Sequence, residues 1–133
     1  VARAAASDIE SGDRDKAAER IIDYWMGRGS WAATPETLRE PIAASMVNVA
    51  GWAEALRSDP TPLRAFGALE MPVLAMVGEH SPKSSRGVTR LLRSVLPNAD
   101  FREMEGLGHM APITHPDEVN QLIAEFLSSP TPA

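Results

Sequence analysis

The sequence contains no cysteine, which excludes a disulfide framework and a thiolate metal site. This absence fits a reducing compartment, so we predict a cytoplasmic protein. Basic residues are outnumbered, with 13 Lys and Arg against 18 Asp and Glu and a net charge of −5. Nucleic-acid binding needs clustered positive charge, so we do not expect it. No apolar run approaches the ~20 residues that cross a bilayer, and no signal peptide is visible, so no membrane span is expected.

The composition is that of an ordinary globular chain. Its 133 residues are 44% apolar and 23% charged. A disordered chain would have fewer apolar and more charged residues. This length suffices for one ordinary domain and is too short for two.

The first part of the chain shows helical patterns and no convincing strand. Residues 1–12 are rich in Ala, Ser and Asp and carry no clear period. Residues 13–27, "DRDKAAERIIDYWMG", place apolar side chains on one stripe, which predicts a helix. Either Asp13 or Asp15 can cap its start by accepting hydrogen bonds from free backbone N–H groups.

A second helical region is predicted over residues 34–58. A threonine cap followed by a proline is a typical helix start, and Thr34 and Pro35 have this order. Pro41 is expected to break or restart the helix, because proline lacks the N–H that the preceding turn requires.

The second half of the chain changes character. Residues 71–78, "MPVLAMVG", form a short unbroken apolar run that is typical of a buried parallel strand. A helix is predicted over 85–96 after the capping pair Ser84-Ser85, then a more polar strand near 100–105. A last amphipathic helix follows Pro116.

The order strand, helix, strand, helix predicts two parallel strands joined through the helix over 85–96. Two strands do not make a stable open sheet by themselves. We therefore expect the sheet to be completed by a missing upstream segment, by another protein chain, or by a second copy in a swapped homodimer.

Two glycine-led loops leave the carboxyl ends of these strands, where parallel α/β sheets bind ligands. The loops are "GEHSPKSS", 78–85, and "GLGHMAP", 106–112, and each carries one histidine. We expect Gly106 and Gly108 to let the chain turn sharply and to expose the ring of His109.

From about Met71 to Leu127 the sequence resembles the C-terminal half of the α/β-hydrolase family. The resemblance rests on "MPVLAMVGEHSP" and on "ADFREMEGLGHMAPITHPDEVNQLIAEFL", with G-x-G-H-M at the strand end. It implies a partial α/β-hydrolase fold. Residues 1–70 would be a helical cap, and residues 71–133 would be the β-α-β-α end of an incomplete parallel sheet.

The resemblance also implies a function. His109 occupies the position of the general base, which takes a proton from a serine and then activates water. The expected reaction is hydrolysis of an ester or a similar small acyl substrate through an acyl-enzyme. The cap would exclude water, and no organic cofactor or metal is implied.

The chain departs from the family pattern at the nucleophile. No G-x-S-x-G motif is present, although the family places its serine in such an elbow. The reactive serine therefore lies on a missing segment or on another chain, or it is absent.

A second departure concerns the triad acid. Ser81 stands where the family usually has an aspartate, and a serine cannot stabilise an imidazolium by charge. Glu79 is a nearby substitute, and an acid following the preceding strand would lie before residue 1.

Several other residues have two readings. Trp25, Trp31 and Trp52 either fill the core of the helical cap or form an apolar roof over a pocket. Met110 follows His109 and either packs or touches substrate. His80 is expected to be exposed.

Two rival functions stay open at this point. The chain could be a non-catalytic module for ligand binding or assembly. It could also belong to a haloperoxidase-like or lyase branch of the same fold, because a fold does not fix the chemistry.

Overall fold

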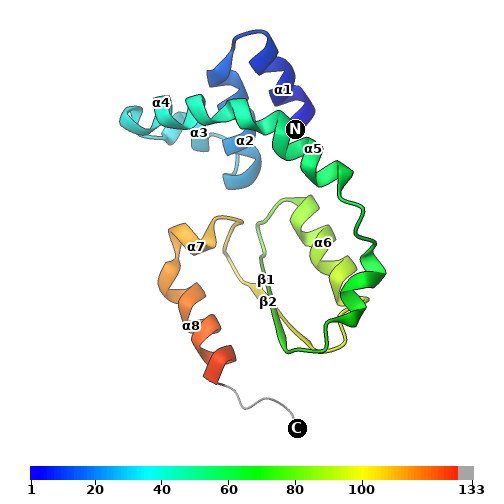
Figure 1. The fold of residues 1–133 in the computed structure, drawn as a ribbon. Helices are drawn as coiled ribbons and strands as arrows, with labels where there is room; N and C mark the ends of the chain where they lie inside the picture. Colours follow the sequence, from blue (N-terminus) through cyan, green and yellow to red (C-terminus); the bar gives the residue numbers. More distant parts are fainter. Residues whose placement is uncertain (129–133) are drawn as a thin grey trace. The chain divides into compact units, whose positions relative to one another are not determined.

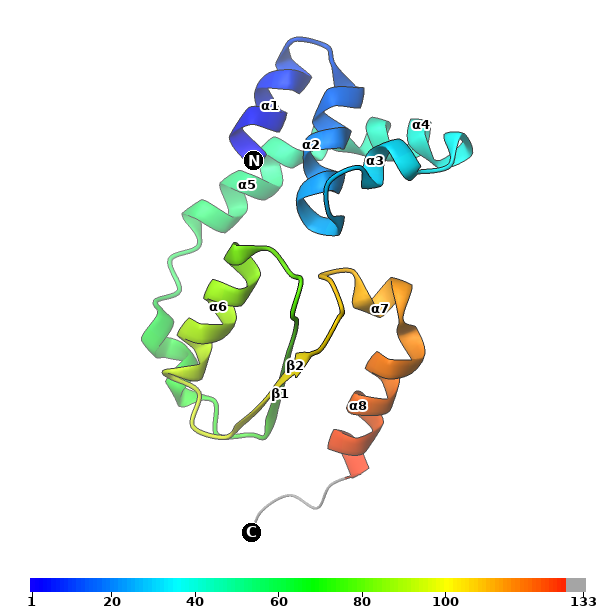
Figure 2. The same cartoon turned by 180° about the vertical axis from the view of Figure 1, so that it is seen from behind.

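A computed structural model describes residues 1–128, and the chain divides into two units (Figures 1 and 2). The first unit is Val1–Pro60, and the second begins at Thr61. The expected boundary between a helical cap and the core, at residue 70, stays a prediction. The short 3-10 helix η2, Leu63–Ala68, belongs to the second unit and packs against one of its helices.

The N-terminal unit is entirely helical. It consists of α1 (Ala2–Glu10), α2 (Arg14–Met26), α3 (Ser30–Ala33), α4 (Glu36–Ser45), the 3-10 helix η1 (Met46–Asn48) and α5 (Val49–Ser58). Helix α1 was not predicted. Its buried residues are Ala5 and Asp8. Because neither is a large apolar residue, the sequence shows no clear helical periodicity here.

Small side chains form the centre of this unit. Ala5, Ala17 and Ala18 are fully buried between α1 and α2. Alanine lets two helices approach closely, because its side chain is a single methyl group. Trp31 and Val49 are also buried in this core.

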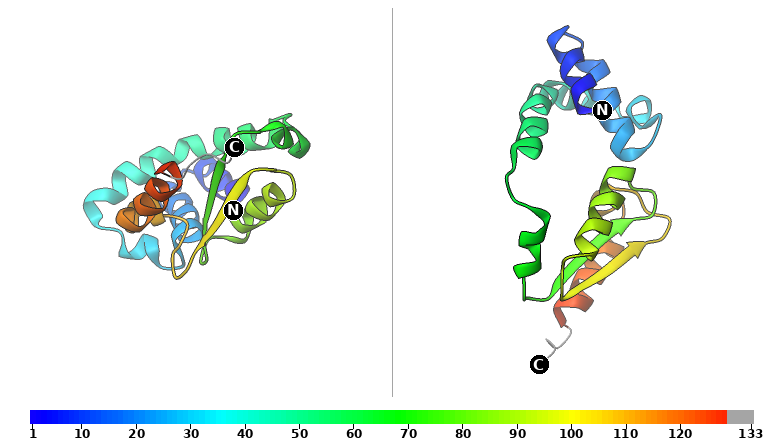
Figure 3. Two further views of the ribbon diagram at one scale, coloured as in Figure 1. Left: turned by 90° about the horizontal axis from the view of Figure 1, so that it is seen from below. Right: turned by 90° about the vertical axis from the view of Figure 1, so that its right-hand side faces the viewer.

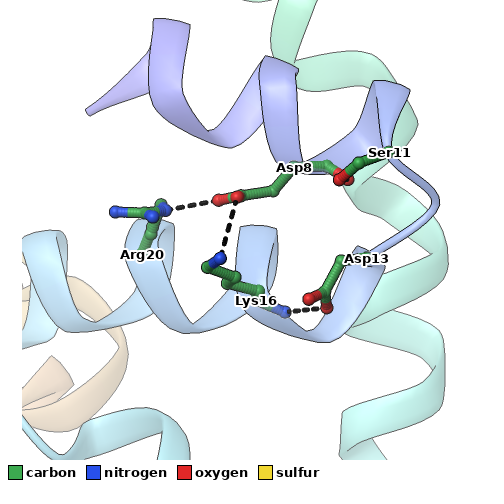
Figure 4. Close-up of polar contacts among 5 residues, drawn as sticks. All are labelled: Asp8, Ser11, Asp13, Lys16 and Arg20. Atoms are coloured by element: carbon green, nitrogen blue, oxygen red, sulfur yellow. Dashed lines mark hydrogen bonds and ion pairs between the residues drawn. The ribbon is translucent and has the colours of Figure 1, made fainter.

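Asp8 ties α1 to α2 through its buried carboxylate (Figure 4). The carboxylate pairs with the guanidinium of Arg20 and lies 3.6 Å from the ammonium of Lys16. Asp13 accepts a 3.0 Å hydrogen bond from the backbone N–H of Lys16. The predicted aspartate cap of α2 is therefore confirmed at Asp13.

A second aspartate positions Trp31. The carboxylate of Asp23 accepts 2.9 Å hydrogen bonds from the backbone N–H groups of Gly29 and Trp31. The Trp31 bond and then the Gly29 bond lower the pKa of Asp23. Gly29 has a φ of +88°, a left-handed conformation that glycine adopts without strain.

Two predictions for the next helix were wrong. Thr34 does not cap its start, because the hydroxyl donates to the carbonyl of Ser30 and closes α3. Pro35 takes the cap position of α4. Pro41 lies inside α4 and does not end it. The carbonyl that loses its donor belongs to Thr37, an exposed residue where water can replace the missing bond.

The C-terminal unit is a strand–helix–strand motif followed by two helices. After η2 come β1 (Val73–Gly78), α6 (Lys83–Arg93), β2 (Ala99–Met104), α7 (Ala111–Thr114) and α8 (Pro116–Ser128). Strands β1 and β2 are parallel, with a register that runs from Val73↔Ala99 to Gly78↔Met104. This confirms the predicted pairing. Helix α6 starts earlier than predicted, with Pro82 at its cap in place of the Ser84-Ser85 pair.

The two faces of this strand pair are covered unequally. Helices α6 and α8 lie on opposite sides of it (Figures 1 and 3). The buried residues Leu107, Ala111 and Val119 pack against Met76 and Met104 on the α8 side. Within residues 1–128 the sheet has two strands, and most of β1 is only half-buried. A strand that is apolar on both faces is therefore left partly uncovered.

None of the helices formed by residues 1–128 is both long and apolar enough to span a membrane.

Candidate active site

Three hydrogen bonds join the loop that follows β1 to the end of β2 and to the loop after it. The backbone N–H of Glu79 donates to the carbonyl of Met104 at 3.0 Å, and that of His80 donates to Leu107 at 2.9 Å. In the other direction, the N–H of Gly106 donates to the Glu79 carboxylate at 2.8 Å. The two loops therefore form one frame at the carboxyl ends of the strands.

Gly78 allows this close approach. A Cβ atom on Gly78 would lie 2.5 Å from the carbonyl oxygen of Leu107 and 2.6 Å from that of Gly108. Gly106 has a φ of +69°, so the expected sharp turn is present there. Gly108 has no positive φ, and a Cβ on it would meet nothing within 4 Å. The expectation that the turn requires Gly108 was wrong, and the requirement for Gly78 was missed.

The ring of His109 lines a cavity of about 440 Å³. Ser81, Ser85 and Met110 line the same cavity. The Nδ1 atom of His109 lies 3.4 Å from the hydroxyl oxygen of Ser85, a long contact for a hydrogen bond. Apolar walls with a few converging polar groups are typical of small-molecule sites.

Ser81 is a buried polar residue in this cavity. It is 4% exposed, and its hydroxyl oxygen has no hydrogen-bond partner among residues 1–128. An unpaired buried hydroxyl costs about 1–3 kcal/mol. A ligand or a further chain segment that hydrogen-bonds to the Ser81 hydroxyl would remove this cost.

Glu79 is placed where it can hold the loop that carries His109. Its carboxylate accepts the N–H of Gly106, three residues before the histidine. This contact gives Glu79 a positioning role for the loop. The role of triad acid stays a prediction.

The three tryptophans all belong to the N-terminal unit. Trp31 is buried in its core, with the Arg39 guanidinium 5.9 Å from the ring centroid. Trp25 is half-buried and meets the ring of Tyr24 edge-on at 4.9 Å. Trp52 is 52% exposed. Their proposed place in a pocket roof stays a prediction.

The other histidines lie outside the cavity lining. His80 is exposed and follows β1. His115 is exposed, and its Nδ1 lies 2.8 Å from the Thr114 hydroxyl. Across the described part of the chain, no three His, Asp or Glu side chains are grouped so that they could hold a metal ion.

Sequence reasoning undervalued two serines. Ser85 was read as a helix cap, and it lines the cavity beside His109. Ser81 was noted only as the place of a lost acid. The available signal was their spacing, because Ser81 follows the strand end by three residues and Ser85 lies one helical turn further on.

Comparisons with solved structures identify the fold. The chain matches MenH from S. aureus with a TM-score of 0.65 and 16% identity, over 95% of this chain and 49% of that one. It matches the enol-lactonase from Burkholderia xenovorans LB400 with a TM-score of 0.66 and 18% identity, over 97% and 50%. A meta-cleavage product hydrolase (CumD) from Pseudomonas fluorescens IP01 matches with a TM-score of 0.60 and 15% identity, over 85% and 45%. No protein-family model and no curated protein matches the chain.

These structures have the α/β-hydrolase fold, so the chain has part of that fold. It spans about half the length of each structure that it matches.

Proposed function

We propose that the chain is the C-terminal half of an α/β-hydrolase-fold enzyme that hydrolyses an ester or a similar small acyl substrate. His109 is the general base, and the nucleophile is supplied from outside these 133 residues. The observation that carries the proposal is the loop frame. It holds the loop that follows β2, and His109 of this loop lines a cavity together with hydroxyl and apolar groups.

The imidazole of His109 suits the proton transfers of this reaction. A histidine near neutral pH takes the proton of an attacking serine, and it returns that proton to the leaving group. It then removes a proton from the water that hydrolyses the acyl-enzyme. The Glu79 carboxylate supports this work by fixing Gly106 and with it the loop. The cytoplasm remains the predicted location.

The proposal includes a partner for β1. Within residues 1–128 this strand pairs with β2 along one edge only, and its residues Val73–Gly78 are apolar. An open edge of this kind accepts another strand. We assign that strand to an upstream segment of the same protein, which would also carry the serine. A second copy of this chain is the alternative.

The test uses the chain together with its upstream reading frame. Turnover of a chromogenic short-chain ester is measured for wild type, His109→Ala and His80→Ala. Loss of a general base typically costs ~10²–10⁴-fold, so His109→Ala should lose at least that much. His80→Ala is the matched control, since it removes an exposed imidazole from the neighbouring loop and should retain near-full activity.

Near-full activity of His109→Ala would exclude the general-base role and favour a binding or assembly module. The 133 residues alone should show no saturable turnover. If they do, and Ser85→Ala abolishes it, the nucleophile is Ser85 and the proposal of an external serine is wrong.

A further inference from the structure

Helix α6 is strongly basic in an acidic chain. Between Lys83 and Arg93 it carries four positive side chains and no acidic one, whereas the whole sequence has a net charge of −5. Arg86, Arg90 and Arg93 are spaced by four and three residues, which places them on one stripe. At 1.5 Å per residue the stripe is about 10 Å long.

This stripe lines a groove rather than open surface. A cavity of about 640 Å³ lies between α6 and β2, and the three arginines, Phe101 and Glu103 line it. The Arg93 guanidinium stacks 4.5 Å from the centroid of the Phe101 ring. The Nε atom of Arg86 is buried and has no hydrogen-bond partner among residues 1–128. A buried guanidinium donor without an acceptor is costly, and an anion in the groove would satisfy it.

The groove has unbalanced positive charge. Within residues 1–128, none of the three stripe arginines forms an ion pair with a carboxylate. Arg102 also borders the groove, but it is bound to Asp100 at 2.8 Å and lowers the pKa of that carboxyl by hydrogen bonding. The three guanidinium groups and the one carboxylate, that of Glu103, together give the groove a net charge of about +2.

We propose that this groove binds the phosphate group of a small phosphorylated ligand. A phosphate monoester carries about −1.5 to −2 charge at pH 7 and offers three acceptor oxygens, which matches the surplus of the groove. Guanidinium groups suit phosphate because they donate two parallel hydrogen bonds, and stacking on Phe101 fixes the plane of one of them. None of the three arginines lines the His109 cavity, so the site does not depend on the proposed catalysis.

The experiment is a titration of the full chain with inorganic phosphate at low ionic strength, followed by the NMR signals of the arginine Nε–H groups. The expected result is a saturable shift of the Arg86 and Arg93 signals that an equal ionic strength of sodium chloride does not produce. Arg90→Gln should weaken binding by about fivefold or more, because hydrogen bonds to charged groups are the strong ones. Glu103→Gln should tighten binding, because it removes the one negative charge.

The matched control is Arg64→Gln, which removes an exposed positive charge from η2 outside the groove. It should leave phosphate affinity within about twofold. Circular dichroism checks that each variant is folded, and Arg90→Lys, which keeps the charge, should bind with an intermediate affinity. Equal weakening by Arg64→Gln and Arg90→Gln would mean general charge attraction and would overturn the proposal. So would the absence of a saturable shift, or tighter binding by Arg90→Gln.

Discussion

Substitution of Gly78 by alanine tests whether the approach of the two loops is as tight as the structure shows. The new Cβ would lie 2.5 Å from the Leu107 carbonyl oxygen, and ordinary contact begins at 3.4 Å. The loop must therefore retreat by about 0.9 Å, which would lengthen the His80–Leu107 hydrogen bond. Overpacking of this kind costs about 1–3 kcal/mol. For a unit of this size we expect the midpoint of thermal unfolding to fall by about 10 °C.

The matched control is a glycine in the facing loop. Gly108→Ala adds the same methyl group where nothing lies within 4 Å and where φ is not positive, so its effect on stability should stay within about 0.5 kcal/mol. Circular dichroism during heating measures both variants. If an assembly that contains the serine hydrolyses esters as proposed, a retreat near 1 Å at His109 should also reduce its turnover by about 10²-fold. If Gly78→Ala is as stable and as active as Gly108→Ala, the close packing of the two loops is wrong.

Three further outcomes are expected. Asp8→Asn should lower the free energy of unfolding of the N-terminal unit by about 1–3 kcal/mol, because it weakens a buried charged contact; denaturant unfolding measures this, and an effect equal to that of Glu10→Gln at an exposed position would refute it. Because the pKa of Asp23 is lowered in the folded state, its carboxylate stabilises the fold fully above the unfolded value of 3.8, and this stabilisation is lost as pH falls through the lower folded value. Acid titration of the wild type should show this loss of stability. If Asp23→Asn shows the same loss, the assignment to Asp23 is wrong. Light scattering should find the isolated chain associated through the β1 edge, whereas a stable monomer would argue against a missing partner.

Much of the C-terminal unit could be predicted from the sequence. The run 71–78 is apolar throughout, which is typical of a buried strand, whereas the segment near 100–105 is more polar, which is typical of a strand near a sheet edge. The connection between them is long enough for a helix. These features gave the parallel pair and its order correctly. The placement of His109 in a sharp turn after the second strand followed from the strand end and from Gly106, whereas Gly108 plays no part in that turn.

The errors have local physical causes. The core of α1 is built from alanine and a paired carboxylate, which a search for large apolar residues does not detect. Pro41 is tolerated because the carbonyl it leaves unpaired lies on the exposed side of α4. Gly78 looked like a strand terminator, and its contact with the second loop is a relation between residues about 30 positions apart. Sequence periodicity contains no information at that range.

The frame around His109 is held mainly by main-chain groups. Two of its three hydrogen bonds join backbone to backbone, and the third needs only the carboxylate of Glu79. Side chains at 109 and 110 take no part in these three bonds, so they can vary without loss of the loop geometry. A library randomised at these two positions should therefore yield mostly folded variants, and the same scaffold could acquire new chemistry through point changes while Gly78 stays fixed.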